Sequence, residues 1–303
     1  MSGIVTIDTR YLGRAEFAAA YLIIEGNRAA FVDNNTNAAV PRLLAQLQAH
    51  GLTPEQVQYL IITHVHLDHA GGTSRLAQSC PNATVIAHPR AAPHVIDPAK
   101  LVASASAVYG EAEFERLYGT IDAVAERRVR AMEDEDTLTF GARTLRFLHT
   151  RGHANHHFCI ADSASGAIFT GDAFGLVYPA LQSHGTFAFP STSPTDFEPA
   201  SCLYPTHYGA VTDIETAAGQ LLRHLDFAEA LRDQAEASDL PDAELTEYCR
   251  SRLYDYFAGL LDGRGRLGRD PDTWSMLALD IELNAQGIAF AASKRRRKAR
   301  TAG

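Results

Sequence analysis

The sequence of 303 residues has no apolar run of the roughly 18 to 20 residues that a bilayer span requires. It begins MSGIVTIDTRYLG, which has no basic segment followed by an apolar one, so we expect a cytoplasmic protein without a membrane partner. Cysteine is scarce, and its four positions lie far apart with no Cys-x-x-Cys pair. This spacing predicts neither a disulfide framework nor a thiolate zinc site, and we expect buried thiols instead. The four are Cys80, Cys159, Cys202 and Cys249.

Positive charge is in deficit, because 27 lysines and arginines face 36 aspartates and glutamates, for a net charge of −9. Six of the basic residues lie in 294–303. Removing their charge of +6 from the total of −9 leaves a net charge of −15 on the rest of the chain. A protein domain with this net negative charge repels polyanions such as nucleic acids. We therefore expect no nucleic-acid partner and interpret 294–303 as a solvated, disordered basic tail.

Short β-rich runs alternate with helical stretches from Ile4 to Asp172, which is typical of an α/β fold. A helical insertion without a strand signal, at about 91–130, divides this region into two halves of similar rhythm. Strands that pair into two sheets with helices outside predict a four-layer αββα sandwich over 1–212. The pattern over 213–293 is wholly helical. This helical C-terminal appendage either completes a substrate pocket or forms a homodimer contact, and the sequence leaves both open.

Residues 64–69 read His-Val-His-Leu-Asp-His and follow directly on a predicted strand. In an extended chain the alternate residues His64 and His66 point the same way, whereas Asp68 and His69 fall on the next turn. One short loop can therefore serve two neighbouring metal ions.

Three further candidate ligands follow in order, each where a predicted strand ends: His153, Asp172 and His207. With the 64–69 motif they resemble the metallo-β-lactamase superfamily over roughly 4–210, and most of all its glyoxalase II (hydroxyacylglutathione hydrolase) branch. The resemblance implies a metallo-β-lactamase sandwich that holds two divalent metal ions. It assigns His64, His66 and His153 to the first metal, Asp68, His69 and His207 to the second, and Asp172 to a bridge between them.

Imidazole and carboxylate ligands without thiolate suit Zn²⁺, Fe²⁺ or Mn²⁺, and we expect zinc. Two such cations lower the pKa of a bridging water from about 16 toward about 7, so no serine or cysteine nucleophile is required. We expect a di-metal hydrolase of a small thioester or ester, with Asp68 and Asp172 as catalytic residues. The alternatives are a lactone or phosphodiester hydrolase, a mononuclear-iron thiol dioxygenase, and a non-catalytic metal-binding module.

Three positions depart from related families. Only 34 residues separate Asp172 from His207, where relatives place a full helix, so delivery of His207 to the second metal is the weakest part of the assignment. His66 stands where flavodi-iron oxygen reductases have glutamate, which argues against redox chemistry. Gly175 stands where lactonases typically have tyrosine, which favours substrates other than lactones.

Four other side chains have two interpretations each, and a fifth has one. His156 and His157 follow His153 closely, and either line the substrate mouth or orient a ligand. Tyr109 and Tyr118 of the insertion either close over a substrate or pack in the core. Tyr208, next to His207, is a candidate to face the site.

Overall fold

The computed structural model of the chain describes residues 2–190, 200–265 and 267–302. They form two compact units. The sandwich unit contains the described residues of 1–178 and 192–214, and the helical unit contains those of 179–191 and 215–303. No helix in these described ranges is both long and apolar enough to span a membrane.

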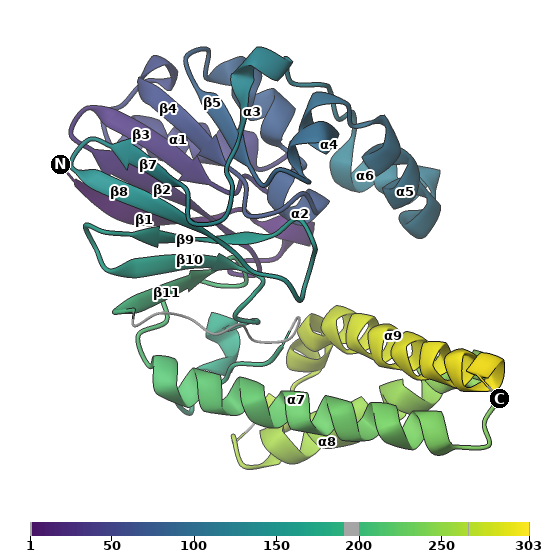
Figure 1. The fold of residues 1–303 in the computed structure, drawn as a ribbon. Helices are drawn as coiled ribbons and strands as arrows, with labels where there is room; N and C mark the ends of the chain where they lie inside the picture. The colour runs from purple at the N-terminus through teal and green to yellow at the C-terminus, as the bar shows by residue number, and fades with distance from the viewer. Residues whose placement is uncertain (1, 191–199, 266, 303) are drawn as a thin grey trace. The chain divides into compact units, whose positions relative to one another are not determined.

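Two mixed β-sheets form the sandwich unit (Figure 1). The first has the order β1-β2-β3-β4-β5-β6, antiparallel from β1 to β3 and parallel from β3 to β6. The second has the order β11-β10-β9-β8-β7 and is antiparallel except for the parallel pair β10–β11. The strands are β1 (Ser2–Asp8), β2 (Ala19–Glu25), β3 (Arg28–Val32), β4 (Val57–Ile61), β5 (Thr84–Ala87), β6 (Val129–Ala131), β7 (Thr137–Phe140), β8 (Arg143–His149), β9 (Phe158–Asp162), β10 (Ala167–Gly171) and β11 (Cys202–Pro205).

Side-chain alternation along the strands builds a core on each face of the first sheet. On β2, Tyr21 and Ile23 pack between the two sheets against Phe147 and Phe169. Leu22 and its neighbours on the other face join a second core with the helices. This second core confirms that helices cover the outer face of the first sheet, as the α/β rhythm predicts.

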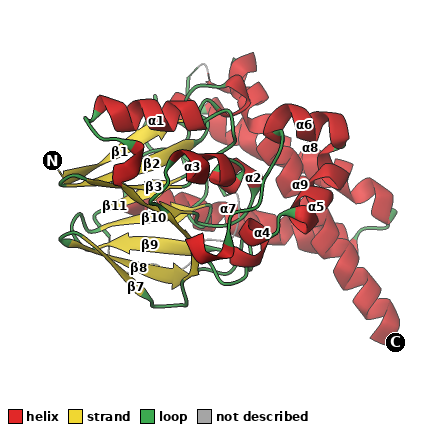
Figure 2. Cartoon of the chain, turned by 90° about the horizontal axis from the view of Figure 1, so that it is seen from above, coloured by secondary structure: helices red, strands yellow, loops and turns green. Residues whose placement is uncertain are grey.

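Helices α1, α3 and α4 supply that cover through Leu43, Leu47, Leu76 and Val95 (Figure 2). Apolar residues of α1 recur at helical spacing, with Val40, Leu43 and Leu47 buried. The helices of this unit are α1 (Val40–Ala49), α2 (Leu67–Ala70), α3 (Thr73–Ser79), α4 (Ala92–Ile96), α5 (Ala99–Tyr109) and α6 (Glu111–Tyr118), with 3-10 turns at Tyr11–Gly13, Pro54–Gln56 and Glu126–Arg128.

The predicted insertion at 91–130 contains α4, α5 and α6, but its end differs from the prediction. Val129–Ala131 forms β6 and pairs with β5 at the edge of the first sheet. The strand gave no sequence signal because it is only three residues long and includes the exposed Arg130.

The helical unit contains three long helices: α7 (Ile214–Ala237), α8 (Leu245–Asp262) and α9 (Pro271–Ala302). Its 3-10 turns are Pro179–Leu181, Asp242–Glu244 and Leu267–Arg269. Every fourth residue of α8 from Leu245 to Leu261 is buried, which is the apolar stripe expected of a packed helix. The described 179–190 also belongs to this unit, so the unit is not solely the predicted C-terminal appendage over 213–293.

The basic tail also differs from the prediction of a disordered end, because α9 continues through Ala302. Arg296 donates hydrogen bonds to the carbonyl oxygens of Ala235, Glu236, Ser238 and Leu240. The last carbonyls of α7 have no partner within their own helix, and a guanidinium with five N–H donors can satisfy several of them. At least part of the tail's charge therefore stabilises the helical unit.

Candidate metal centre

The 64–69 motif lies where β4 gives way to α2. His66 is extended (φ −62°, ψ 146°) and caps α2, whose first turn contains Asp68 and His69. The backbone N–H of His69 donates to the carbonyl of His66, which closes this turn. His66 therefore lies on an extended residue, and Asp68 and His69 lie on the turn that follows it, whereas His64 lies in the bend after β4.

The seven predicted ligands converge in one place, as three overlapping groups that could hold metal ions. In the first, Nε2 of His153 lies 3.1 Å from Nε2 of His64 and 2.9 Å from Nδ1 of His66. The other groups are His64, His69 and Asp172, and Asp68, His69 and His207, in each of which the ligand atoms lie within 4.8 Å of one another.

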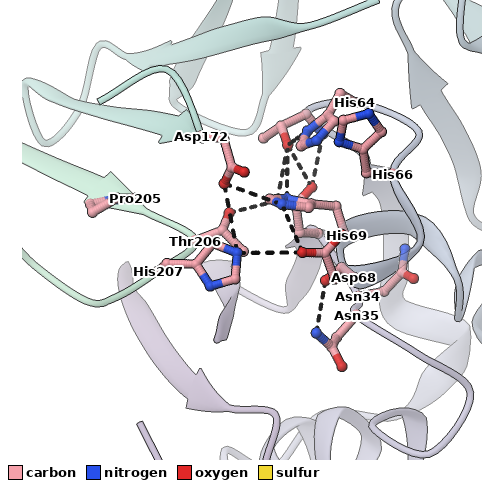
Figure 3. A network of polar contacts seen from close by, with 12 residues as sticks. Asn34, Asn35, His64, His66, Asp68, His69, Asp172, Pro205, Thr206 and His207 are labelled. Atoms are coloured by element: carbon pink, nitrogen blue, oxygen red, sulfur yellow. Dashed lines mark hydrogen bonds and ion pairs between the residues drawn. The ribbon is translucent and has the colours of Figure 1, made fainter. Parts of the chain in front are cut away.

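Asp172 contacts both ends of this cluster, and Figure 3 shows its contacts with His69 and His207. Its Oδ2 is 3.5 Å from Nε2 of His153, on the side of the first group. Its Oδ1 is 3.2 Å from Nε2 of His69 and 3.8 Å from Nε2 of His207. One carboxylate therefore reaches both groups, which is the position that a bridging ligand requires.

His207 reaches the cluster although the intervening chain is short. Strand β11 pairs in parallel with β10, and the N–H of Thr206 donates to the carbonyl of Gly171. Nε2 of His207 then lies 3.5 Å from Oδ2 of Asp68. The concern that His207 might be stranded is therefore resolved. Within this interval, Ser193-Pro194-Thr195-Asp196 has the sequence pattern of a helix start, and these residues lie outside the described ones.

The electrostatics of the cluster suit cations. Burial, together with repulsion from neighbouring imidazoles, lowers the pKa of His64, and the same two causes lower the pKa of His66 to about 4. Burial alone would raise the pKa of Asp172, but His69, His153 and His207 hold it well below its usual range. An ionised carboxylate and neutral imidazoles are the forms that bind metal. Against the effect of burial, however, the nearby carboxylates raise the pKa of His69 and raise that of His207 to about 9, so these two rings must release a proton when a cation binds.

A buried nitrogen atom without a hydrogen-bond partner also supports metal binding at this cluster. Nε2 of His69 is fully buried and makes no hydrogen bond within the described part of the chain. Buried polar atoms normally have a partner, and a metal ion accepts the lone pair of an imidazole nitrogen. Five imidazoles and two carboxylates also form a donor set appropriate to a pair of divalent cations.

Asp33, which the sequence did not point to, supports the cluster through hydrogen bonds to His69 and to the residues behind it. It directly follows β3, is 1% exposed, and accepts hydrogen bonds from the N–H of Thr63 and the hydroxyl of Thr206, each at 2.8 Å. Its Oδ2 also lies 2.8 Å from Nδ1 of His69. Because the carboxylate accepts the Nδ1 proton, the lone pair of His69 is left on Nε2, toward the cluster. The one sequence signal was an acidic residue at the end of the AAFVD strand.

His157 orients the site rather than lining its mouth. Its Nε2 accepts the backbone N–H of Asp172 at 3.3 Å, and its Nδ1 lies 2.6 Å from the hydroxyl of Thr150. Gly171 makes this contact possible, since a Cβ at that position would lie 2.5 Å from Nε2 of His157. His156 instead stacks on His64, with ring centroids 6.1 Å apart.

Aromatic side chains adjoin one side of the cluster. The ring centroids of Phe17 and Tyr178 lie 6.2 and 6.4 Å from that of His207. Tyr118 is buried, and its hydroxyl lies 3.0 Å from that of Tyr11. Tyr208 packs against the core between the sheets, which does not support its predicted place at the site.

Comparisons with known proteins agree with this geometry. Residues 13–197, more than half of the chain, match the family model of the metallo-beta-lactamase superfamily. The lactamase-like protein adaB of Aspergillus niger is 24% identical over 209 residues, which cover 67% of this chain and 54% of adaB. The chain therefore spans about half the length of this curated relative.

Two solved structures share the fold. ST1585 from Sulfolobus tokodaii, an archaeal metallo-beta-lactamase superfamily protein, has a TM-score of 0.64 at 19% identity, covering 95% of this chain and 98% of its own. TTHA1429, a metallo-beta-lactamase family protein from Thermus thermophilus, has a TM-score of 0.59 at 17% identity, covering 98% and 93%. At these sequence identities, the similarity establishes a shared fold and nothing about activity.

Proposed function

We propose that this chain, which belongs to the metallo-β-lactamase superfamily, is a di-metal hydrolase that uses a metal-activated water on a small thioester or ester. The observation that carries the proposal is the placement of Asp172, whose two oxygens face opposite ends of a seven-residue ligand set. His64, His66 and His153 would hold one cation, Asp68, His69 and His207 the other, and Asp172 would bridge them.

Two divalent cations, for which we favour zinc over iron or manganese, would supply Lewis acidity and a hydroxide at neutral pH. Asp68 then has a role of its own. Its side chain is 26% exposed, against 7% for Asp172 and His207. Burial opposes ionisation of Asp68, but His69 and His207 outweigh it and hold the pKa of this carboxyl low, so it stays ionised and can accept a hydrogen bond from the attacking water, although a carboxyl with a lowered pKa is a weak base.

The cysteines do not offer an alternative nucleophile. Cys80, Cys159 and Cys249 are buried, whereas Cys202, also expected to be buried, is only half-buried. Burial raises the pKa of the Cys80 and Cys159 thiols to about 12 and that of Cys249 to about 11, and it also raises the pKa of Cys202. The thiolate is the reactive form, and it is scarce under these conditions at neutral pH. Water is therefore the favoured attacking group.

The charge of the chain favours a small substrate over a polyanion. The chain carries a net charge of −9, and Arg295 and Arg296 of the basic tail are engaged by Asp233 and Asp242. These features weigh against phosphodiester or nucleic-acid cleavage.

The test combines elemental analysis with a substrate panel. We expect about two metal ions per chain and cleavage of an acyl-glutathione thioester or a 4-nitrophenyl ester. Turnover of only a lactone or bis(4-nitrophenyl) phosphate would select those alternatives. One iron per chain with oxygen uptake would select a thiol dioxygenase. Metal-replete protein inert toward the whole panel would leave the non-catalytic metal-binding module.

Replacing Asp172 by alanine tests the bridge directly. We expect Asp172→Ala to lose activity and both metals, because each group loses a shared carboxylate oxygen. Far-UV circular dichroism of the variant monitors folding. A folded Asp172→Ala protein that kept two tightly bound metals would reject the bridging role.

A further inference from the structure

The helical unit contains a hollow of about 160 Å³ between α7 and α8. Arg223 and His224 of α7, Tyr256 of α8 and Arg264 beyond its end provide polar walls. Phe187 and Leu260 provide apolar ones. All of these residues belong to the helical unit, so the hollow is described without reference to the metal centre.

Two guanidinium groups converge on this hollow without a carboxylate partner. No Asp or Glu in the described ranges lies within ion-pair distance of Arg223 or Arg264, although acidic residues outnumber basic ones in the chain. Burial lowers the pKa of Arg264, so its charge is partly desolvated without a counter-charge. Guanidinium groups in this condition are suited to carboxylate and phosphate oxygens.

Arg264 is fixed in place before any ligand arrives. Its Nη1 and Nη2 donate to the carbonyl oxygens of Gly185 and Thr186, at 3.1 and 2.9 Å. Its guanidinium carbon lies 4.7 Å from the centroid of the Phe187 ring. A guanidinium has five N–H donors, so three are left for a ligand. A preorganised donor loses less side-chain entropy when it binds.

His224 provides a second, independent sign of an unmet partner. The residue is 6% exposed, and its Nε2 donates to the carbonyl oxygen of Ala188 at 3.1 Å. Its Nδ1 is buried and has no hydrogen-bond partner in the described chain. Burial lowers the pKa of His224 to about 4, so the ring is neutral near pH 7 and Nδ1 presents a lone pair. A buried acceptor left in this state calls for an explanation, which the P–O–H group of a singly charged phosphate would provide and a carboxylate would not.

We propose that this hollow binds a small organic anion, with its phosphate or carboxylate group on Arg223 and Arg264 and its organic part against Phe187 and Leu260. The volume limits the ligand to an oxyanion and a few further heavy atoms. The site uses no residue of the metal centre, so its occupancy is measurable whatever the metal centre hydrolyses.

The test uses the metal-loaded protein with three probes: inorganic phosphate, phenyl phosphate and benzoate. Calorimetry measures affinity, and the imidazole NMR signals of His224, assigned with His224→Gln, report local binding. We expect phenyl phosphate or benzoate to bind more tightly than inorganic phosphate and to shift the His224 signals. The better of the two identifies the anionic group as phosphate or carboxylate.

Arg223→Gln is the decisive variant, because Arg223 is exposed and its loss leaves the bonds of Arg264 intact. We expect at least tenfold weaker binding. Arg252→Gln is the matched control, since Arg252 is an exposed arginine of α8 outside the hollow. Unchanged affinity in Arg223→Gln, as anion binding at the metals would give, overturns the proposal. An equal loss in both variants, or no shift of His224, also overturns it.

Discussion

Asp33 gives the sharpest test of how the fold prepares the metal centre. In the variant Asp33→Asn the side chain keeps its shape, but one oxygen becomes an NH₂ group. If the remaining oxygen still accepts from the N–H of Thr63, the NH₂ group faces Nδ1 of His69 and the hydroxyl of Thr206. The opposite orientation sets the NH₂ group against the N–H of Thr63. The carboxylate has no such conflict, since it only accepts.

The conflict has two calculable consequences. With an NH₂ group beside it, Nδ1 of His69 must become the acceptor, so the proton moves to Nε2 and blocks the nitrogen that faces Asp68 and Asp172. Changes of this kind behind a ligand typically weaken metal binding 10- to 100-fold, or about 1.4 to 2.8 kcal/mol. Losing one or two charged hydrogen bonds costs a further 2 to 5 kcal/mol of folding stability, roughly.

Chelator competition with elemental analysis measures the first effect, and urea unfolding measures the second. We expect Asp33→Asn to retain the metal on His64, His66 and His153 while the second metal is lost at lower chelator concentration. Asp162→Asn is the matched control, because Asp162 is equally buried but bonds Arg143 and Ser165 instead. It should lose stability without losing metal. A folded Asp33→Asn protein with both metals bound at wild-type affinity would refute the reasoning.

Two further predictions concern stability. Gly171→Ala should destabilise the protein by about 2 to 4 kcal/mol in urea unfolding, because φ is +50° and the new Cβ would lie within 3 Å of His157 and Thr63. The control Gly26→Ala, at φ +63° with open space around it, should show only the smaller backbone cost. Equal losses of stability in the two variants would contradict the steric argument. As the pH falls from 6.5 toward 4, His224 should remove up to about 3 kcal/mol of folding stability. The reason is that the ring takes up a proton in the unfolded chain but not when it is buried beside Arg223 and Tyr256. The free energy of unfolding of His224→Gln should fall less steeply with pH over this interval, and a parallel pH dependence would contradict the assignment.

The ligand set was predictable because most of its information is local. The 64–69 motif sets four side chains by chain geometry alone. Asp172 directly follows the fully buried β10, and His207 and His153 follow the ends of β11 and β8 by two and four residues. Asp33 lacked such a signal. It is a single acidic residue 36 positions before His69, and only the parallel pairing of β3 with β4 brings the two together.

The basic tail failed as a prediction for a related reason. Composition identifies a charged segment but not the acceptors that its side chains will meet. The carbonyl partners of Arg296 lie 56 to 61 positions earlier in the chain, at the end of α7 and in the turn after it. A run of charge therefore indicates disorder only where the rest of the fold offers no unsatisfied helix end.

Part of the segment between Asp172 and His207 belongs to the helical unit. Residues 179–190 belong to the helical unit, where Leu181, Phe187 and Phe189 are buried. Gln220 of α7 holds this segment by accepting from the N–H of Ala188 and donating to the carbonyl of Thr186. A parallel connection such as β10 to β11 needs a dozen or more residues, usually as a helix, to return to the same edge of the sheet. In this connection, the described residues 179–190 contribute buried side chains to the helical unit. They therefore also hold α7 in place.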